Sequence, residues 1–312
     1  MDRRPLGRSE IVIEPLVLGG NVFGWTVDEK SAFDILDAFV AEGFTAIDTA
    51  EGYPNWVPGN PPGMSETIIG KWLKARGNRN SVHIFTKVNS ANKPGGLKAD
   101  QVASGFEASL KRLQTDYVDV YFSHWPDPET SHEETLGAYD PMIRAGKVRT
   151  IGASNFTAEM IREAHETSVI KSLPRYEVLQ PRYNLYDRAE FDALRDTVIE
   201  TEMGAVVYYS LASGFLTGKY RSKADFGKSP RGGGIERYLD AKGEKILAAL
   251  DQVSAANDAT PAEVSLAWLV AQPGVTSPIA SATSVEQVKS LAKGVRLKLS
   301  DEDLQLLTDA GK

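Results

Sequence analysis

The chain has 312 residues, of which 42% are hydrophobic and 25% are charged, as is typical of a globular protein. Its net charge of −7, without a basic tail, argues against nucleic acid as a partner. The sequence contains no cysteine, which excludes disulfides, thiolate metal sites and cysteine nucleophiles and is consistent with a reducing compartment.

The beginning of the sequence does not have the pattern of an export signal. Arg3 and Arg4 precede an apolar run, Ile11–Leu18, but Glu14 and Pro15 interrupt that run. No stretch of the sequence is long and apolar enough to span a bilayer. We therefore expect a cytoplasmic protein without a membrane partner.

Short apolar segments recur along the chain and predict eight strands. Before them, Pro5–Gly7 and Arg8–Glu10 are expected to turn a short β-hairpin. The segments are apolar throughout and rich in β-branched residues, as strands buried on both faces are. In chain order they are Val17–Gly20, Thr45–Thr49, His83–Val88, Val118–His124, Val148–Ser154, Val178–Asn184, Ala205–Ser210 and Val275–Ser281.

Segments with apolar residues at helical spacing lie between these strands. Six are well defined: Asp28–Ala41, Ser65–Ala75, Thr157–Glu166, Asp187–Glu202, Ala262–Ala271 and Thr283–Ala292. Two other segments, Pro54–Met64 and Lys219–Gly234, are too rich in proline and glycine for helix or strand. We expect both to be long loops after strands, where long loops are often functional.

Eight strand–helix repeats predict an α/β fold, a (β/α)8 TIM barrel with an N-terminal β-hairpin. A doubly wound sheet is the alternative, and it would need a glycine-rich turn between its first strand and first helix. The first strand here is instead followed by G-G-N-V-F-G without an immediate helix. We therefore assign residues 1–312 to one barrel domain.

Four polar side chains fall at or just beyond the ends of three successive strands: Asp48, Tyr53, Lys87 and His124. In a TIM barrel these ends meet at one mouth, where active sites lie. A tyrosine phenol becomes a useful acid near neutral pH when a lysine ammonium stabilises its anion. An aspartate would keep that lysine charged, and a histidine would hydrogen-bond the substrate oxygen. The set suits reduction of a carbonyl to an alcohol.

Taken singly, each of these residues has an ordinary structural use, such as a turn cap or a packed loop aromatic. The prediction therefore depends on the four side chains lying together.

We interpret the other histidines, His83, His132 and His165, as satisfied core residues. A hydrolase or isomerase would need carboxylate pairs, metal ligands or a phosphate site, and Asp48 is the acidic residue we place at a strand end.

Beyond this chemistry, the sequence is similar to the aldo-keto reductases over nearly its whole length. The segment G-F-T-A-I-D-T-A-E-G-Y, Gly43 to Tyr53, resembles the family signature around its catalytic aspartate and tyrosine. Lys87 and His124 match the rest of the family's catalytic tetrad. The resemblance implies a nicotinamide cofactor across the barrel mouth, a small-molecule carbonyl substrate and no metal.

The resemblance extends to potassium-channel β-subunits, so a cofactor-sensing regulatory subunit is the alternative function. The sequence has no long N-terminal arm, which we take to argue against channel blocking. Physiological substrate and oligomeric state are left open by the sequence.

The resemblance also implies the cofactor contacts. Ser154, Asn155 and Gln180 would hold the nicotinamide carboxamide, and Tyr209 would stack on the ring. The small-residue loop after strand 7 would line the pyrophosphate, where backbone N–H groups can approach phosphate oxygens. That loop contributes Ser210, Leu211, Ser213 and Gly214, with Lys219 adding charge; Ser281, Thr283 and Gln287 would bind the adenosine part.

The choice between NADP and NAD depends on that last segment. Thr283 stands where the resemblance leads us to expect arginine, which would bind a 2′-phosphate more strongly. Lys219, Arg221 or Lys228 could supply the charge from the long loop, so we expect NADPH, with NADH as the alternative.

The expected substrate pocket is lined by three tryptophans on the loops after strands 1, 2 and 4, which would suit an apolar carbonyl compound. They are Trp25, Trp56 and Trp125. We expect the loop that carries Trp56, residues 54–64, to narrow the mouth or act as a lid.

Overall fold

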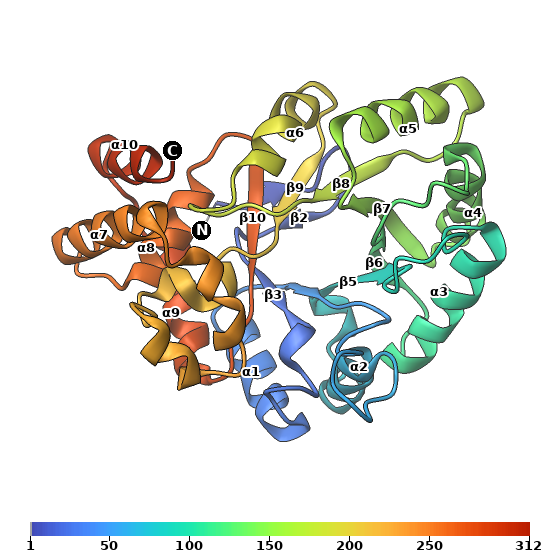
Figure 1. Ribbon diagram of the computed structural model, residues 1–312. Coiled ribbons are helices and arrows are strands. Elements are labelled where there is room, and N and C mark those ends of the chain that lie inside the picture. The colour runs from blue at the N-terminus through green and yellow to red at the C-terminus, as the bar shows by residue number, and fades with distance from the viewer. Residues whose placement is uncertain (1) are drawn as a thin grey trace.

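The structure is a computed structural model that describes residues 2–312. Eight parallel strands close into a barrel in the order β10-β3-β4-β5-β6-β7-β8-β9 (Figure 1). This confirms the predicted (β/α)8 TIM barrel. The strands are β3 (Val17–Gly19), β4 (Ala46–Asp48), β5 (His83–Val88), β6 (Val118–Ser123), β7 (Val148–Ser154), β8 (Tyr176–Gln180), β9 (Gly204–Val207) and β10 (Val275–Ala280).

Helices surround the barrel, one after nearly every strand (Figure 1). The described residues form α1 (Glu29–Ala41), α2 (Met64–Arg76), α3 (Ala99–Leu113), α4 (His132–Arg144), α5 (Ala158–Lys171), α6 (Ala189–Glu200), α7 (Ala241–Ala256), α8 (Pro261–Val270), α9 (Val285–Arg296) and α10 (Asp301–Ala310). Thr260 caps α8 together with Glu263 in a reciprocal capping box, which explains why that helix begins at Pro261. No helix within residues 2–312 is long and apolar enough to cross a membrane.

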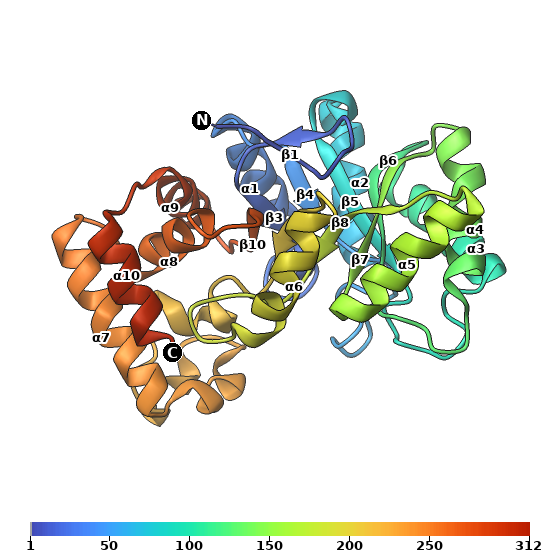
Figure 2. The ribbon, with the colours of Figure 1, turned by 90° about the horizontal axis from the view of Figure 1, so that it is seen from above.

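The predicted N-terminal hairpin is confirmed. Strands β1 (Arg4–Pro5) and β2 (Val12–Ile13) pair antiparallel at one end of the barrel (Figure 2). The hairpin buries Leu6, Ile11 and Ile13 against residues of the barrel interior, so it closes the floor at the end opposite the candidate site. Arg4 also donates hydrogen bonds to the Val275 and Thr276 carbonyls at the start of β10, which fixes the hairpin in place.

Six of the eight strands end earlier than predicted, and three of these ends lie next to candidate-site residues. Strand β8 ends at Gln180 because Pro181, which has no N–H group, interrupts the ladder. Strand β9 ends at Val207, and shortly afterwards Tyr209 takes a left-handed backbone conformation at φ 58°. Strand β6 ends at Ser123, so His124 is the first residue of the loop.

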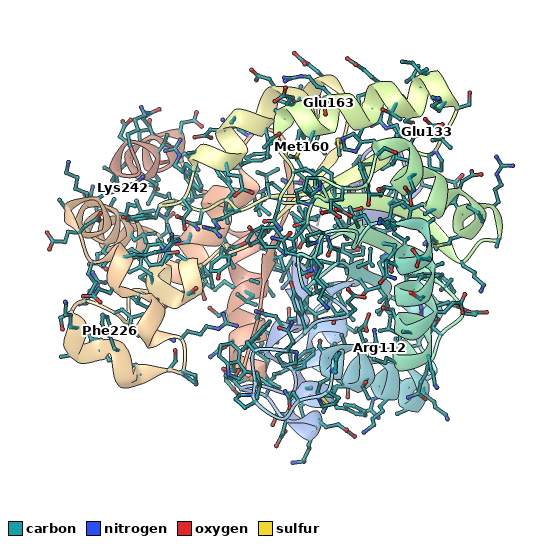
Figure 3. The ribbon with its side chains drawn as sticks, turned by 45° about the vertical axis from the view of Figure 1, so that its right-hand side comes forward. Arg112, Glu133, Met160, Glu163, Phe226 and Lys242 are labelled. Carbon is teal, nitrogen blue, oxygen red and sulfur yellow. The ribbon has the colours of Figure 1, made fainter. Side chains whose placement is uncertain are left out.

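The two expected loops connect strand ends to helices. The segment 54–64 is irregular up to Met64, where α2 begins. The segment 219–234 contains two short 3-10 turns, Lys223–Lys228 and Gly232–Gly234. Phe226, which is labelled in Figure 3, belongs to the first turn, and its side chain packs against the hydrophobic core.

The interpretation of three histidines as core residues was wrong. His83, His132 and His165 are all half-buried. His83 lies at the start of β5 and contacts the Thr45 hydroxyl at 3.0 Å through Nδ1. His132 Nε2 lies 3.8 Å from a carboxylate oxygen of Glu163, which is labelled on α5 in Figure 3. Helix faces, not the barrel interior, therefore accommodate His132 and His165.

Candidate active site

A buried ion pair lies at the mouth of the barrel. Lys87 and Asp48 come from neighbouring strands, and the Lys87 Nζ lies 2.7 Å from both carboxylate oxygens and 2.7 Å from the Thr49 carbonyl oxygen. These three acceptors match the three N–H donors of an ammonium, so the buried charge is fully partnered. Burial lowers the pKa of Lys87, and the Asp48 charge opposes that shift.

Tyr53 follows β4 and lies beside this pair. The Lys87 Nζ is 4.9 Å from the centre of the Tyr53 ring. Burial raises the pKa of the Tyr53 phenol well above its usual value of 10, and the negative charge of Asp48 raises it further. Burial and the Asp48 charge outweigh any lowering by the lysine, so the phenol is protonated at neutral pH in the free protein.

His124 completes the quartet on the loop after β6. Its ring meets the Tyr53 ring edge to face, with centroids 5.8 Å apart, and its Nδ1 lies 2.9 Å from the hydroxyl of Ser90. Burial holds the pKa of His124 well below 6.5, and the Lys87 charge adds to this effect. The imidazole is therefore neutral at physiological pH. The four predicted side chains do lie together.

Aromatic side chains border this group. Trp56 packs edge to face against Tyr53 and against Trp25, with 5.7 Å between centroids in both pairs, and is 46% exposed. Trp125 stacks on His124 at 6.2 Å. Asn60 donates a 2.7 Å hydrogen bond to the Gly24 carbonyl, which ties the loop 54–64 to the loop after β3. The three tryptophans thus come from three loops and surround the phenol and the imidazole.

The polar residues at the ends of β7 and β8 form a connected network with the quartet. The Gln180 amide donates to Asp48 Oδ1 at 2.9 Å, and the Ser154 hydroxyl donates to the Gln180 carbonyl at 2.8 Å. Asn155 donates to the His124 carbonyl at 2.8 Å and accepts from the Tyr208 hydroxyl at 2.7 Å. The predicted carboxamide contacts are therefore adjacent to the quartet, with their amides held in fixed orientations.

The loop after β9 exposes a ring next to a stretch of small residues. Tyr209 is 44% exposed and Arg182 lies over its ring at 5.1 Å. Ser213 and Gly214 have left-handed backbone conformations, at φ 57° and 99°. A Cβ at Gly214 would lie 3.6 Å from both the Lys219 Nζ and the Tyr220 ring, so both side chains lie beside this glycine. The buried Ser210 turns its hydroxyl to the Val207 carbonyl, and Leu211 is half-buried.

The residues predicted for the adenosine part lie at the start of α9. Ser281 donates to Asn21 at 2.6 Å, and Thr283 bonds the side-chain oxygen of Gln287 through its backbone N–H at 2.8 Å. Two of the basic residues expected to reach this segment are paired elsewhere. Arg221 forms a two-point ion pair with Asp251, and Lys228 pairs with Asp225. Lys219 makes no ion pair within residues 2–312.

Sequence reasoning missed several side chains that support the quartet. Glu51 lies inside the signature segment, and its carboxylate accepts the Ser90 backbone N–H at 3.1 Å; burial raises its pKa. The fully buried Glu66 accepts from Thr86 and from Arg112, which is labelled on α3 in Figure 3. Glu51 could have been identified from the sequence, because it lies within the D-T-A-E-G-Y motif. Glu66 lies in α2, and its sequence context does not indicate a link to the site.

Another unexpected side chain approaches the aromatic border. Arg231, from the segment 219–234, lies over the Trp25 ring at 5.3 Å. Its Nη2 atom is buried without a hydrogen-bond partner among residues 2–312. Burial lowers the pKa of this guanidinium.

Within residues 2–312, no group of three or more histidine, aspartate or glutamate side chains is arranged to hold a metal ion.

Comparison with known proteins places these features in a family. The family model described as the Aldo/keto reductase family matches residues 15–312. "Uncharacterized oxidoreductase YrpG" of Bacillus subtilis is 33% identical over 99% of this chain and 95% of its own. "Putative voltage-gated potassium channel subunit beta" of Schizosaccharomyces pombe is 32% identical over 98% and 92%. The protein named as the NADP(+) aldo-keto reductase yakc of that yeast is 30% identical over 80% and 75%.

Proposed function

Because the chain belongs to the aldo/keto reductase family, we propose that it reduces aldehydes or ketones to alcohols, using NADPH as hydride source and Tyr53 as proton donor. The observation that carries the proposal is the convergence of Asp48, Tyr53, Lys87 and His124 at one barrel mouth. The tryptophans around the mouth favour apolar carbonyl compounds as substrates.

The roles follow from the protonation states. Tyr53 is protonated at neutral pH and therefore carries the proton that the carbonyl oxygen takes up as it becomes an alcohol. The Lys87 ammonium, 4.9 Å from the Tyr53 ring, stabilises the phenolate left behind, and Asp48 holds that ammonium in place. The neutral imidazole of His124 offers a ring nitrogen to the substrate oxygen without adding a charge.

The donor set fits a nicotinamide dinucleotide. Ser154, Asn155 and Gln180 present amides and a hydroxyl at the strand ends, next to the exposed ring of Tyr209. The left-handed turn at Gly214 lies beside the Lys219 ammonium, and this combination suits a phosphate group. When bound, the cofactor supplies the hydride. The residues of the mouth orient the carbonyl and exclude water around it.

The cofactor is NADPH in this proposal. A relative named for NADP(+) supports that choice, as does the Lys219 ammonium, which no carboxylate within the described residues neutralises. Fluorescence titration of the protein with NADPH and NADH tests it. We expect tighter binding of NADPH, and a clear preference for NADH would overturn the assignment.

The proton-donor role is tested by Tyr53→Phe. We expect loss of NADPH oxidation with every aldehyde of a panel while NADPH binding, followed by fluorescence, is retained. Tyr117→Phe is the matched control, because Tyr117 precedes β6 at the opposite end of the strands and bonds Asn80 at 3.1 Å. Unchanged turnover in Tyr53→Phe would refute the mechanism.

The alternative function is a nicotinamide-sensing regulatory subunit, favoured by the likeness to a protein named as a channel subunit. The two functions are distinguished by the aldehyde panel and by a search for a stable membrane partner. Turnover of an aldehyde by the isolated chain supports the reductase. A chain that binds NADPH, reduces none of the panel and co-purifies with a membrane protein supports the alternative.

A further inference from the structure

Ser90 lies behind His124 and contacts the ring nitrogen that faces away from Nε2. The Ser90 Oγ is 2.9 Å from His124 Nδ1. Ser90 belongs to the turn after β5, where Asn89 takes a left-handed conformation at φ 62° and its side chain accepts the Lys93 N–H at 3.0 Å. A second bond joins the Ser90 backbone N–H to Glu51 at 3.1 Å. These two bonds hold the turn that carries the hydroxyl.

The loop that carries Tyr53 also fixes this position. A Cβ added at Gly52 would lie 2.5 Å from the Ser90 Cβ, closer than real Cβ contacts come. Glycine at position 52 therefore lets the turn after β5 touch the loop after β4. As a result, the segments that carry the phenol, the serine and the imidazole are packed as one unit at the barrel mouth.

The direction of the Ser90–His124 hydrogen bond follows from counting donors. A neutral imidazole carries one N–H, on either Nδ1 or Nε2. If Nδ1 carried the proton, the half-buried Ser90 hydroxyl would accept that bond and would have no side chain or carbonyl among residues 2–312 to donate to. If the hydroxyl donates to Nδ1, both groups are satisfied. The proton of the imidazole then resides on Nε2.

We propose that Ser90 is a positioning residue that fixes His124 in the tautomer with the proton on Nε2, so that the ring donates a hydrogen bond to the substrate's carbonyl oxygen. The opposite tautomer would present a lone pair to that oxygen and repel it. The kinetic part of this inference rests on the proposed reductase function. The tautomer itself is a property of the free protein and does not.

The tautomer is measured directly by NMR of the full chain labelled with 15N in histidine. The sequence has four histidines, and His124→Gln assigns the relevant signals by their loss. We expect a hydrogen-bearing Nε2 and a bare Nδ1 in the parent protein, and a mixture of both tautomers in Ser90→Ala. A parent spectrum with the proton on Nδ1, or an unchanged spectrum in Ser90→Ala, overturns the proposal.

Kinetics then test the consequence. Loss of one oriented donor to a reacting oxygen typically slows an enzyme by about 100-fold or more; since part of the Ser90→Ala population keeps the right tautomer, we expect kcat to fall about tenfold, with NADPH affinity unchanged. Ser90→Cys, with a weaker donor of similar size, should lie between. Ser104→Ala, which removes an exposed hydroxyl on α3, is the matched control and should leave kcat unchanged.

A double-variant cycle separates positioning from general structural damage. In the His124→Gln background, Ser90→Ala should cause no further loss of kcat, because the imidazole it orients is gone. An equal loss in both backgrounds overturns the proposal. If the parent protein reduces no carbonyl compound, the proposed function fails, and the NMR result alone decides whether Ser90 sets the tautomer.

Discussion

Asp48→Asn removes the charge that neutralises a fully buried lysine. In the parent protein Lys87 is 0% exposed, and two of its three hydrogen bonds go to the Asp48 carboxylate. Without that charge, releasing the lysine proton costs the folded variant less free energy than keeping an uncompensated ammonium buried. The unfolded chain still holds it, with a pKa of about 10.4.

This route sets an upper limit on the destabilisation and makes it depend on pH. Deprotonating a lysine costs about 1.36 kcal/mol per unit between its pKa and the pH, which gives about 4.6 kcal/mol at pH 7 and about 1.9 kcal/mol at pH 9. The unfolded state binds one more proton than the folded variant, so the variant gains stability as the pH rises. We expect the gap to the parent protein to narrow by about 2.7 kcal/mol between these pH values.

Urea unfolding at pH 7 and pH 9, followed by circular dichroism, measures the gap. Asp251→Asn is the matched control, since it breaks an exposed ion pair with Arg221 and should cost less than about 1 kcal/mol at both pH values. Adding Lys87→Met to Asp48→Asn should recover much of the loss, because no uncompensated charge remains buried. A gap of the same size at both pH values, or a double variant no more stable than Asp48→Asn, would refute the reasoning.

Three further predictions concern the rest of the site. Since burial and the Lys87 charge hold the pKa of His124 well below 6.5, kcat/KM should stay flat as the pH falls through 6.5; an acidic limb centred there would contradict this. Tyr208→Phe leaves the Asn155 side-chain oxygen unpaired and should cost about 1–2 kcal/mol in urea unfolding, with weaker NADPH binding by fluorescence; an unchanged variant argues against the network. Trp56→Ala should cost about 1–2 kcal/mol in urea unfolding, because it removes two edge-to-face aromatic contacts of a half-buried ring, and should raise KM for bulky apolar aldehydes about 2- to 10-fold in steady-state assays; equal KM values would remove Trp56 from the pocket.

Much of the fold could be predicted from the sequence because strands buried on both faces leave a strong local signal. All eight barrel strands were located, and α1 and α8 were recognised by apolar residues at helical spacing; the structure adds that Asp28 and Thr260 cap them. The strand ends were less accurate. Residues such as Tyr209 leave the extended conformation because of the turn that follows, and that turn depends on contacts made across the barrel mouth.

The site was predictable only in part, for a related reason. Asp48 and Lys87 fall on strands whose order around the barrel follows from the fold, so their meeting could be expected. The contact between Ser90 and His124 joins two irregular loops, and no sequence pattern in either loop predicts it. The protonation of Tyr53 also needed the structure, because it depends on how deeply the phenol is buried and on its proximity to Asp48.

The way the barrel is sealed has a consequence for its synthesis. Strand β3 pairs with β10 through Val17 with Ile279 and Leu18 with Ala280, and Arg4 bonds the Val270 carbonyl 266 residues further along the chain. At about 5–20 residues per second, a ribosome needs roughly 15 to 50 seconds to deliver those partners. Until then one side of β3 presents unpaired N–H and C=O groups, which attract other strands. The nascent chain therefore carries an edge open to aggregation until β10 has been synthesised and pairs with β3.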